Sequence, residues 1–195
     1  MELKKYQKNV IADLRDYLAE WEDVLDPAEA YRSFWESRQI AVGDDGVPEY
    51  QDTLDGVPRV CFKVPTGGGK TLLAAASLRP IFEILPPSSP RVVVWLVPTE
   101  PILTQTLAAL RSPEHPYRQQ LNLSFGSRVE VYSKEALLAG ENFSPAAVTE
   151  QVSVMVLTFD SFRREKEKLQ SFKANEHLTA FASFLGTPDR PITLA

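Results

Sequence analysis

The sequence has few residues that form disulfides or bind metals, and it has no long apolar run. Cys61 is the only cysteine, so no disulfide can form within the chain, and we expect this thiol to be buried on an apolar strand. The two histidines lie far apart with no Cys or acidic cluster at ligand spacing, which argues against a dedicated metal site. The longest apolar run, residues 92–97, is far shorter than the roughly 20 residues that span a bilayer.

Basic residues are not in excess, and the formal net charge of the chain is -5. Contact with nucleic acid therefore has to come from local groups rather than from an overall positive field. The first residues, M-E-L-K-K-Y-Q-K, carry charges where a signal peptide needs an apolar core. With 44% hydrophobic and 24% charged residues, the 195-residue chain has the composition of a soluble domain, and we expect it to be cytoplasmic, with no membrane segment.

Helical and strand-like segments alternate along the chain. Apolar residues at helical spacing predict a helix over residues 3–25, and Asp26, Pro27 and Glu29 predict the start of a second helix. The Gly-, Asp- and Pro-rich residues 43–58 predict a loop with a short hairpin. Short β-branched runs follow, apolar on both faces as in buried parallel strands. The predicted strands are 60–64, 92–97, 129–132 and 152–157, and the predicted helices between them are 70–85, 101–110, 133–138 and 145–150.

This order of elements predicts an α/β fold. Strands that alternate with helices form a parallel sheet, and the crossover helices cover both of its faces, which gives three layers. We expect the chain to divide into an N-terminal helical segment with its loop, residues 1–57, and a sheet domain, residues 58–195.

Three consecutive glycines stand between a predicted strand and a predicted helix, in the stretch V-P-T-G-G-G-K-T at residues 64–71. Strand, loop and helix in this order form a phosphate-binding loop, in which glycines let several backbone N–H groups point at one anion. The generic pattern has Gly where this chain has Val64, so we assign the cradle to Thr66, Gly67, Gly68, Gly69, Lys70 and Thr71. Lys70 would reach the β- and γ-phosphates, and Thr71 would bind Mg²⁺. The alternative is a Gly-rich turn that only links strand to helix.

The loop P-T-G-G-G-K-T resembles that of superfamily 2 helicases and translocases of the DEAD/DEAH type, in particular the ATPase (Res) subunit of type III restriction enzymes. L-V-P-T-E-P-I-L-T-Q-T at 96–106 is similar to the family's motif Ia, V-L-T-F-D-S-F at 156–162 to the Thr-containing motif after it, and K-K-Y-Q-K at 4–8 to its Gln motif. The resemblance implies a RecA-like P-loop domain that binds ATP and Mg²⁺ and moves on DNA. It also implies two partners, a second RecA-like domain and a DNA methyltransferase or specificity subunit.

The same resemblance suggests roles for further residues, and each has a simpler alternative. The Gln7 amide can donate to N7 of adenine and accept from its N6 amino group, or it can be a solvated side chain near a helix start. Pro98 and Thr99 would contact the nucleic-acid backbone, although Thr99 is equally suited to cap a helix. Thr158 would join them, or it is an ordinary residue at a strand end. Glu100 stands where many relatives have Arg, which indicates weak or partner-dependent binding of a strand.

The carboxylates that this family uses for hydrolysis are missing. No D-E-x-H or D-E-x-D sequence occurs in the chain, and Asp160 is the only imitation of a carboxylate at a strand end. We therefore expect residues 58–195 to be an ATP-binding domain truncated before the DExx box, with residues 191–195 as the start of the strand that carries it. The isolated chain should then be inactive. Two alternatives remain open, a P-loop small-molecule kinase or other phosphotransferase and a non-catalytic nucleotide-binding module.

Overall fold

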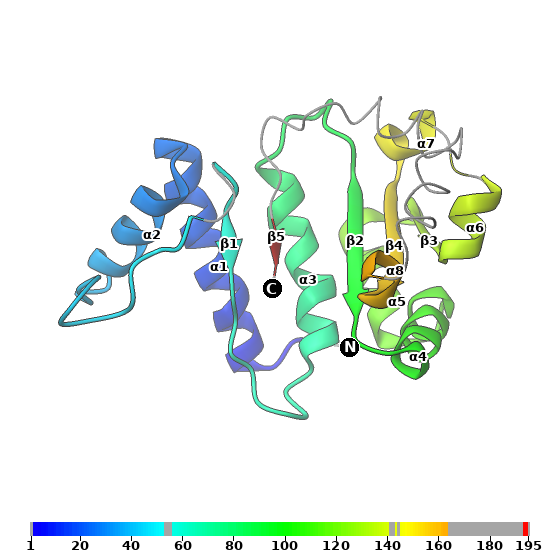
Figure 1. Cartoon of the computed structure of the whole chain (residues 1–195), viewed down its shortest axis with the longest axis horizontal. Helices are drawn as coiled ribbons and strands as arrows, with labels where there is room; N and C mark the ends of the chain where they lie inside the picture. The colour runs from blue at the N-terminus through cyan, green and yellow to red at the C-terminus, as the bar shows by residue number, and fades with distance from the viewer. Residues whose placement is uncertain (1, 53–55, 141–142, 144, 164–192, 195) are drawn as a thin grey trace. The chain divides into compact units, whose positions relative to one another are not determined.

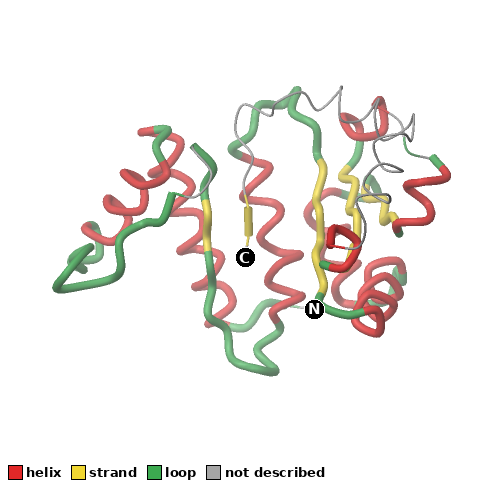
Figure 2. Tube along the Cα trace, in the orientation of Figure 1, coloured by secondary structure: helices red, strands yellow, loops and turns green. Residues whose placement is uncertain are grey.

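The computed structural model describes residues 2–52, 56–140, 143, 145–163 and 193–194. These residues form two compact units: residues 2–86 with 193–194, and residues 87–163. Figure 1 labels the helices and strands, and Figure 2 colours them by type. The boundary expected between residues 57 and 58 stays a prediction.

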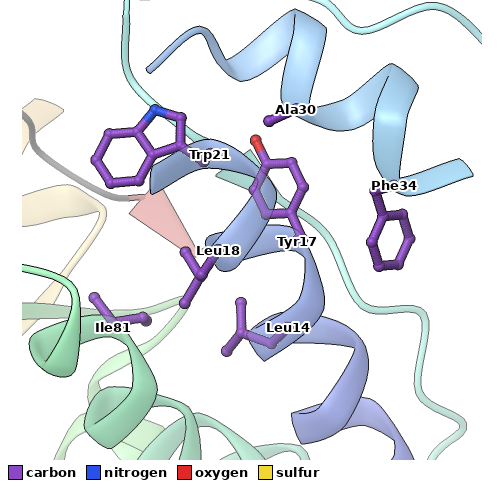
Figure 3. Packing of buried hydrophobic residues seen from close by; sticks show 7 residues of the cluster. All are labelled: Leu14, Tyr17, Leu18, Trp21, Ala30, Phe34 and Ile81. Atoms are coloured by element: carbon purple, nitrogen blue, oxygen red, sulfur yellow. The ribbon is translucent and has the colours of Figure 1, made fainter. Parts of the chain in front are cut away.

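The first unit begins with two helices, α1 (Lys5–Val24) and α2 (Pro27–Glu36), which pack against each other. The carboxylate of Asp26 accepts hydrogen bonds of 2.8 Å from the N–H groups of Ala28 and Glu29, and Pro27 starts α2. The sequence prediction of both helices is thereby confirmed. Their apolar faces meet α3 in one buried cluster, shown in Figure 3, made of Leu14, Tyr17, Leu18, Trp21, Ala30, Phe34 and Ile81.

Helix α3 (Lys70–Glu83) follows the glycine loop and also contacts α1. Arg79 and Arg15 each donate a hydrogen bond of 2.8 Å to Glu83, so one carboxylate joins the two helices. The hydrogen bond from Arg79 lowers the pKa of Glu83, and Arg15 adds to the effect. Because these side chains are half exposed, the ion pairs contribute little energy and the buried cluster is what fixes α1 beside α3.

Strand β1 (Arg59–Val60) lies parallel to β5 (Thr193–Leu194), with Arg59 opposite Thr193 and Val60 opposite Leu194. The strand predicted over 60–64 begins one residue earlier in the structure and ends at Val60, so β1 covers only residues 59–60. Cys61 is exposed, so the expectation of a buried thiol was wrong. In the loop before β1, a single bridge between Val42 and Val47 stands where a short hairpin was predicted. Of residues 191–195, the structure describes only 193 and 194.

The second unit is built on a parallel sheet of β2 (Val92–Val97), β4 (Val152–Thr158) and β3 (Val129–Tyr132), with β4 in the centre. All seven residues of β4 are buried, as the two-sided apolar pattern predicted. Val97 pairs with Thr158, so β2 and β4 end at the same level. The residues that follow these two strands therefore emerge together at one edge of the sheet.

Helices of the second unit cover the sheet, which confirms the predicted α/β fold. They are α4 (Glu100–Arg111), α5 (Pro116–Phe125), α6 (Lys134–Ala139), α7 (Pro145–Glu150) and α8 (Asp160–Arg163). Leu137 of α6 and Val148 of α7 form a buried cluster with Met155 and Leu157 of β4. Val156 lies between Met155 and Leu157 on β4 and points to the opposite face of the sheet, since side chains alternate along a strand. Helix α4 also contacts β4.

Helix α5 has no counterpart among the predicted elements. Pro116 occupies its first turn, and Nδ1 of His115 accepts a 3.3 Å hydrogen bond from the N–H of Tyr117. Leu121 is the only residue of this helix that is fully buried. The sequence does carry signals for this helix: Tyr117, Leu121 and Phe125 recur every four residues, Pro116 suits a first turn, and Gly126 suits a helix end.

Candidate functional site

The glycine loop turns sharply between residue 64 and the start of α3. Gly67 and Gly69 have φ angles of 77° and 74°, in the left-handed region that favours glycine. The N–H of Gly68 donates to the carbonyl oxygen of Pro65 at 3.0 Å and closes the turn. The ammonium of Lys70 donates to the same oxygen at 3.1 Å. Lys70 therefore folds back over the loop, and its charge lies within the turn that the glycines form.

Two side chains of α1 hold the other side of the loop. The hydroxyl of Tyr6 donates to the carbonyl oxygen of Gly68 at 2.6 Å, and Nε2 of Gln7 donates to the same atom at 3.1 Å. Oε1 of Gln7 accepts a 2.9 Å hydrogen bond from the N–H of Lys4. Gln7 is 4% exposed, so it is a buried residue here and not a solvated one. The contact of Tyr6 with Gly68 joins residues far apart along the chain, so no local sequence signal could have indicated it.

The groups of the loop suit a polyphosphate with a bound magnesium ion. Thr66, Gly67 and Lys70 are exposed, and Thr71 is half-buried in the first turn of α3. The first N–H groups of this 14-residue helix are at its positive end, where anions bind. An ammonium, a hydroxyl and backbone N–H groups are donors that phosphate oxygens accept, and a threonine hydroxyl is a usual ligand of nucleotide-bound Mg²⁺. Since both donors of Gly68 O come from α1, this carbonyl is turned away from the loop interior.

The second unit brings together the residues predicted to contact nucleic acid. Pro98 and Thr99 are exposed and link β2 to α4, and Thr158 ends β4 at the same level. Thr99 occupies the cap position of α4, but its side chain makes no capping hydrogen bond. Thr158 is 2% exposed, and its hydroxyl is 3.5 Å from Oε1 of Glu100 and 3.1 Å from Oγ of Ser161. The structure therefore places all three residues at one edge of the sheet, with the hydroxyl of Thr158 already bonded.

A cavity of about 180 Å³ opens beside Thr158. Its lining combines hydroxyls, one ammonium and three carboxylates with apolar strand residues: Glu100, Leu103, Lys134, Glu135, Val156, Leu157, Thr158, Asp160 and Ser161. Within the part of the chain that the structure describes, no group of three His, Cys, Asp or Glu side chains is arranged to hold a metal ion. None of the helices in the described residues is long and apolar enough to cross a membrane.

Comparison with known proteins identifies a family. Residues 1–181 match a family model described as "Type III restriction enzyme, res subunit". No curated protein matches the chain. The matched range includes the glycine loop, α1 with Tyr6 and Gln7, and the residues around Thr99 and Thr158.

Proposed function

Because the chain belongs to the family of type III restriction enzyme res subunits, we propose that it binds ATP with Mg²⁺ and is the first part of a motor that moves on DNA. The family has a RecA-like P-loop fold with a helicase-like ATP-binding domain, and the parallel strands seen here belong to such a fold. The observation that carries the proposal is the glycine loop, which places Lys70 and Thr71 at the start of α3.

Nucleotide binding exchanges one partner of Lys70 for another. Its bond to the Pro65 carbonyl is exposed to water and has a neutral acceptor, so breaking it costs little. A bond from the same ammonium to a phosphate oxygen joins opposite charges and contributes about 1.5 to 3 kcal/mol. The exchange therefore favours the bound nucleotide, and Thr71 would add its hydroxyl to the magnesium shell.

The Gln7 amide has enough hydrogen-bonding capacity to hold the loop and to recognise adenine. A glutamine amide offers two N–H groups and two acceptor lone pairs. The bonds to Gly68 and Lys4, the contacts it makes among the described residues, use one of each. We propose that the second N–H donates to N7 of adenine and that the second lone pair accepts from its N6 amino group. Guanine presents an acceptor, O6, at that position and would leave the lone pair unpaired.

We assign the nucleic-acid track to the edge of the sheet where β2 and β4 end. Pro98 and Thr99 are exposed there, beside the positive end of the 12-residue helix α4, which favours a phosphate. Helicase families of this kind act on DNA, so DNA is the proposed track. In the full-length protein, ATP-driven closure against a second RecA-like domain would move the strand, and a methyltransferase or specificity subunit would direct it to its site.

Hydrolysis needs carboxylates that the 195 residues do not contain in the family's D-E-x-H or D-E-x-D form. Strand β5 runs parallel to β1, the strand that leads to the glycine loop, with Leu194 opposite Val60. Residues that continue β5 in the full-length protein would run alongside 61–64 toward the loop. We propose that the catalytic carboxylates lie there, and that the 195-residue chain binds nucleotide without hydrolysing it.

Calorimetric titration with Mg²⁺–ATP, combined with an assay of phosphate release, tests this proposal. The 195-residue chain should bind ATP, lose affinity in Lys70→Ala and keep it in Lys63→Ala, a matched removal of an exposed ammonium before the loop. It should release no phosphate, whereas the full-length protein should hydrolyse ATP faster with DNA. Failure to bind ATP would reduce the loop to a structural turn, and a phosphorylated small product would identify a kinase. Lys70-dependent turnover by the 195-residue chain would refute the missing carboxylates and make Asp160 the first candidate.

A further inference from the structure

The carboxylate of Glu100 lies where the proposed track would place a phosphate of the nucleic acid. We propose that Glu100 competes with the strand for the hydroxyl of Thr158 and thereby keeps the affinity of this domain for nucleic acid low. This inference rests on the proposed DNA track. Glu100 would then set the affinity for nucleic acid, and a mutation of Glu100 could raise this affinity.

The first observation is that the hydroxyl of Thr158 has one hydrogen to donate. Its oxygen is 3.5 Å from Oε1 of Glu100, a carboxylate that can only accept, so this contact uses the hydrogen of Thr158. Either hydroxyl can donate in the 3.1 Å contact between Ser161 and Thr158, and we assign the donor to Ser161, which leaves the hydrogen of Thr158 for Glu100. Thr158 is 2% exposed and lines the cavity, so a phosphate oxygen that reaches its hydroxyl there has to displace an existing partner. A phosphate oxygen and the Glu100 carboxylate therefore exclude each other at this hydroxyl.

The second observation is the start of α4, where Glu100 stands in the first turn. A carboxylate in the first turn is stabilised by the positive end of the helix, as a phosphate would be. Pro101 follows and has no N–H, so it removes one of the donors that a helix start usually offers to an anion. The helix end is thus already partly neutralised by its own side chain.

The third observation is the charge around the cavity beside Thr158. Glu100, Glu135 and Asp160 contribute three carboxylates to its lining, against one ammonium from Lys134. Among the residues that the structure describes, a phosphate entering this cavity meets net negative charge. Glu100 is the carboxylate of the three that is bonded to Thr158, so its removal should have a larger effect than the loss of a carboxylate elsewhere on the same unit.

The size of the effect follows from the internal bond that is weakened. A hydrogen bond to a carboxylate is roughly twice as strong as one to a neutral amide, and this difference changes an equilibrium roughly fivefold. Replacing Glu100 with Gln removes the charge and keeps the shape of the side chain. We therefore expect E100Q to bind an oligonucleotide about fivefold more tightly than the unmodified chain at low salt, with a smaller gain at higher salt.

The test is fluorescence anisotropy with a labelled single strand of about 20 nucleotides and the duplex of the same sequence, at two salt concentrations. The matched control is Glu114→Gln, which removes an exposed carboxylate of the same unit outside the cavity. E100Q should bind more tightly and Glu114→Gln should not, and adding Thr158→Val to E100Q should cancel the gain. Adding Ser161→Ala to E100Q instead keeps the buried threonine and its hydroxyl, so the gain should survive there.

The outcomes separate this inference from the proposed function. Equal affinity of E100Q and the unmodified chain refutes the competition while the DNA track stands. An equal gain in Glu114→Gln shows an effect of net charge alone and also refutes it. If neither the unmodified chain nor E100Q binds either oligonucleotide, the proposed track at this edge is wrong and the role of Glu100 falls with it. A gain that Thr158→Val leaves intact places the competition at another group and refutes the assignment to Thr158.

Discussion

Substituting Gly69 with alanine tests how α1 shapes the phosphate loop. The φ angle of Gly69 is 74°, and a Cβ added to it would lie 2.7 Å from Nε2 of Gln7. Gly67 has a φ angle of 77°, but a Cβ there would meet no atom within 4 Å. In both variants the new alanine takes the left-handed conformation, which costs about 1 to 2 kcal/mol. Only Gly69→Ala must also displace Gln7.

The two substitutions should therefore differ by the contacts of Gln7. Displacing its amide breaks the 3.1 Å bond to Gly68 and disturbs the 2.9 Å bond from Lys4. A typical hydrogen bond contributes about 0.5 to 1.5 kcal/mol, and a buried group left unpaired costs about 1 to 3 kcal/mol. We expect Gly69→Ala to reduce the free energy of unfolding by about 1 to 2 kcal/mol more than Gly67→Ala, and to weaken ATP binding more.

Urea unfolding followed by tryptophan fluorescence gives the comparison, since Trp21 and Trp35 lie in the same unit as the loop. The decisive measurement repeats both substitutions in a Gln7→Ala background, where the added Cβ has room. The cost of Gly69→Ala should then fall to that of Gly67→Ala. Equal costs of the two glycine substitutions in the unmodified chain, or a difference that persists without Gln7, would refute the role of this contact.

Two further predictions concern the ligand itself. Lys70→Ala should weaken ATP binding roughly 30- to 150-fold, because the charged bond to the phosphates is lost, and calorimetry should show the fold retained with this loss of affinity. Tyr6→Phe should weaken binding of ATP, GTP and pyrophosphate by one common factor, since its 2.6 Å bond positions the loop, whereas Gln7→Ala should also narrow the preference for ATP over GTP. An unchanged ATP-to-GTP ratio in Gln7→Ala would end its assignment to adenine.

The elements that sequence predicted well are those whose signals are local. The β-branched runs of β2, β3 and β4 were located to within a residue, because a buried parallel strand is apolar on both faces. The start of α2 was equally clear, since Asp26 and Pro27 act within the same turn. The glycine loop belongs to this class, because consecutive glycines, lysine and threonine occupy adjacent positions.

The features that sequence could not give depend on contacts between distant residues. The pairing of β1 with β5 joins residues that lie far apart along the chain. Tyr6 and Gly68 are 62 positions apart, and Glu100 and Thr158 are 58 apart. Sequence assigned Gln7, Thr158 and Glu100 to functional positions one at a time. It could not show that Gln7 also holds the loop, or that Glu100 and Thr158 share one hydrogen bond.

In both candidate sites, the side chain that would donate a hydrogen bond to a ligand already donates one to another group of the protein. Lys70 donates to Pro65, and Thr158 donates to Glu100. The affinity of each site is then the difference between a ligand bond and an internal bond, so removing the donor and removing the internal acceptor have opposite effects. Lys70→Ala removes a donor and should weaken binding, whereas E100Q weakens an acceptor and should strengthen it. The Pro65 acceptor is a backbone carbonyl that no side-chain substitution removes, so we expect substitutions of Tyr6 and Gln7, which bond to Gly68 in the same loop, to change the nucleotide affinity instead.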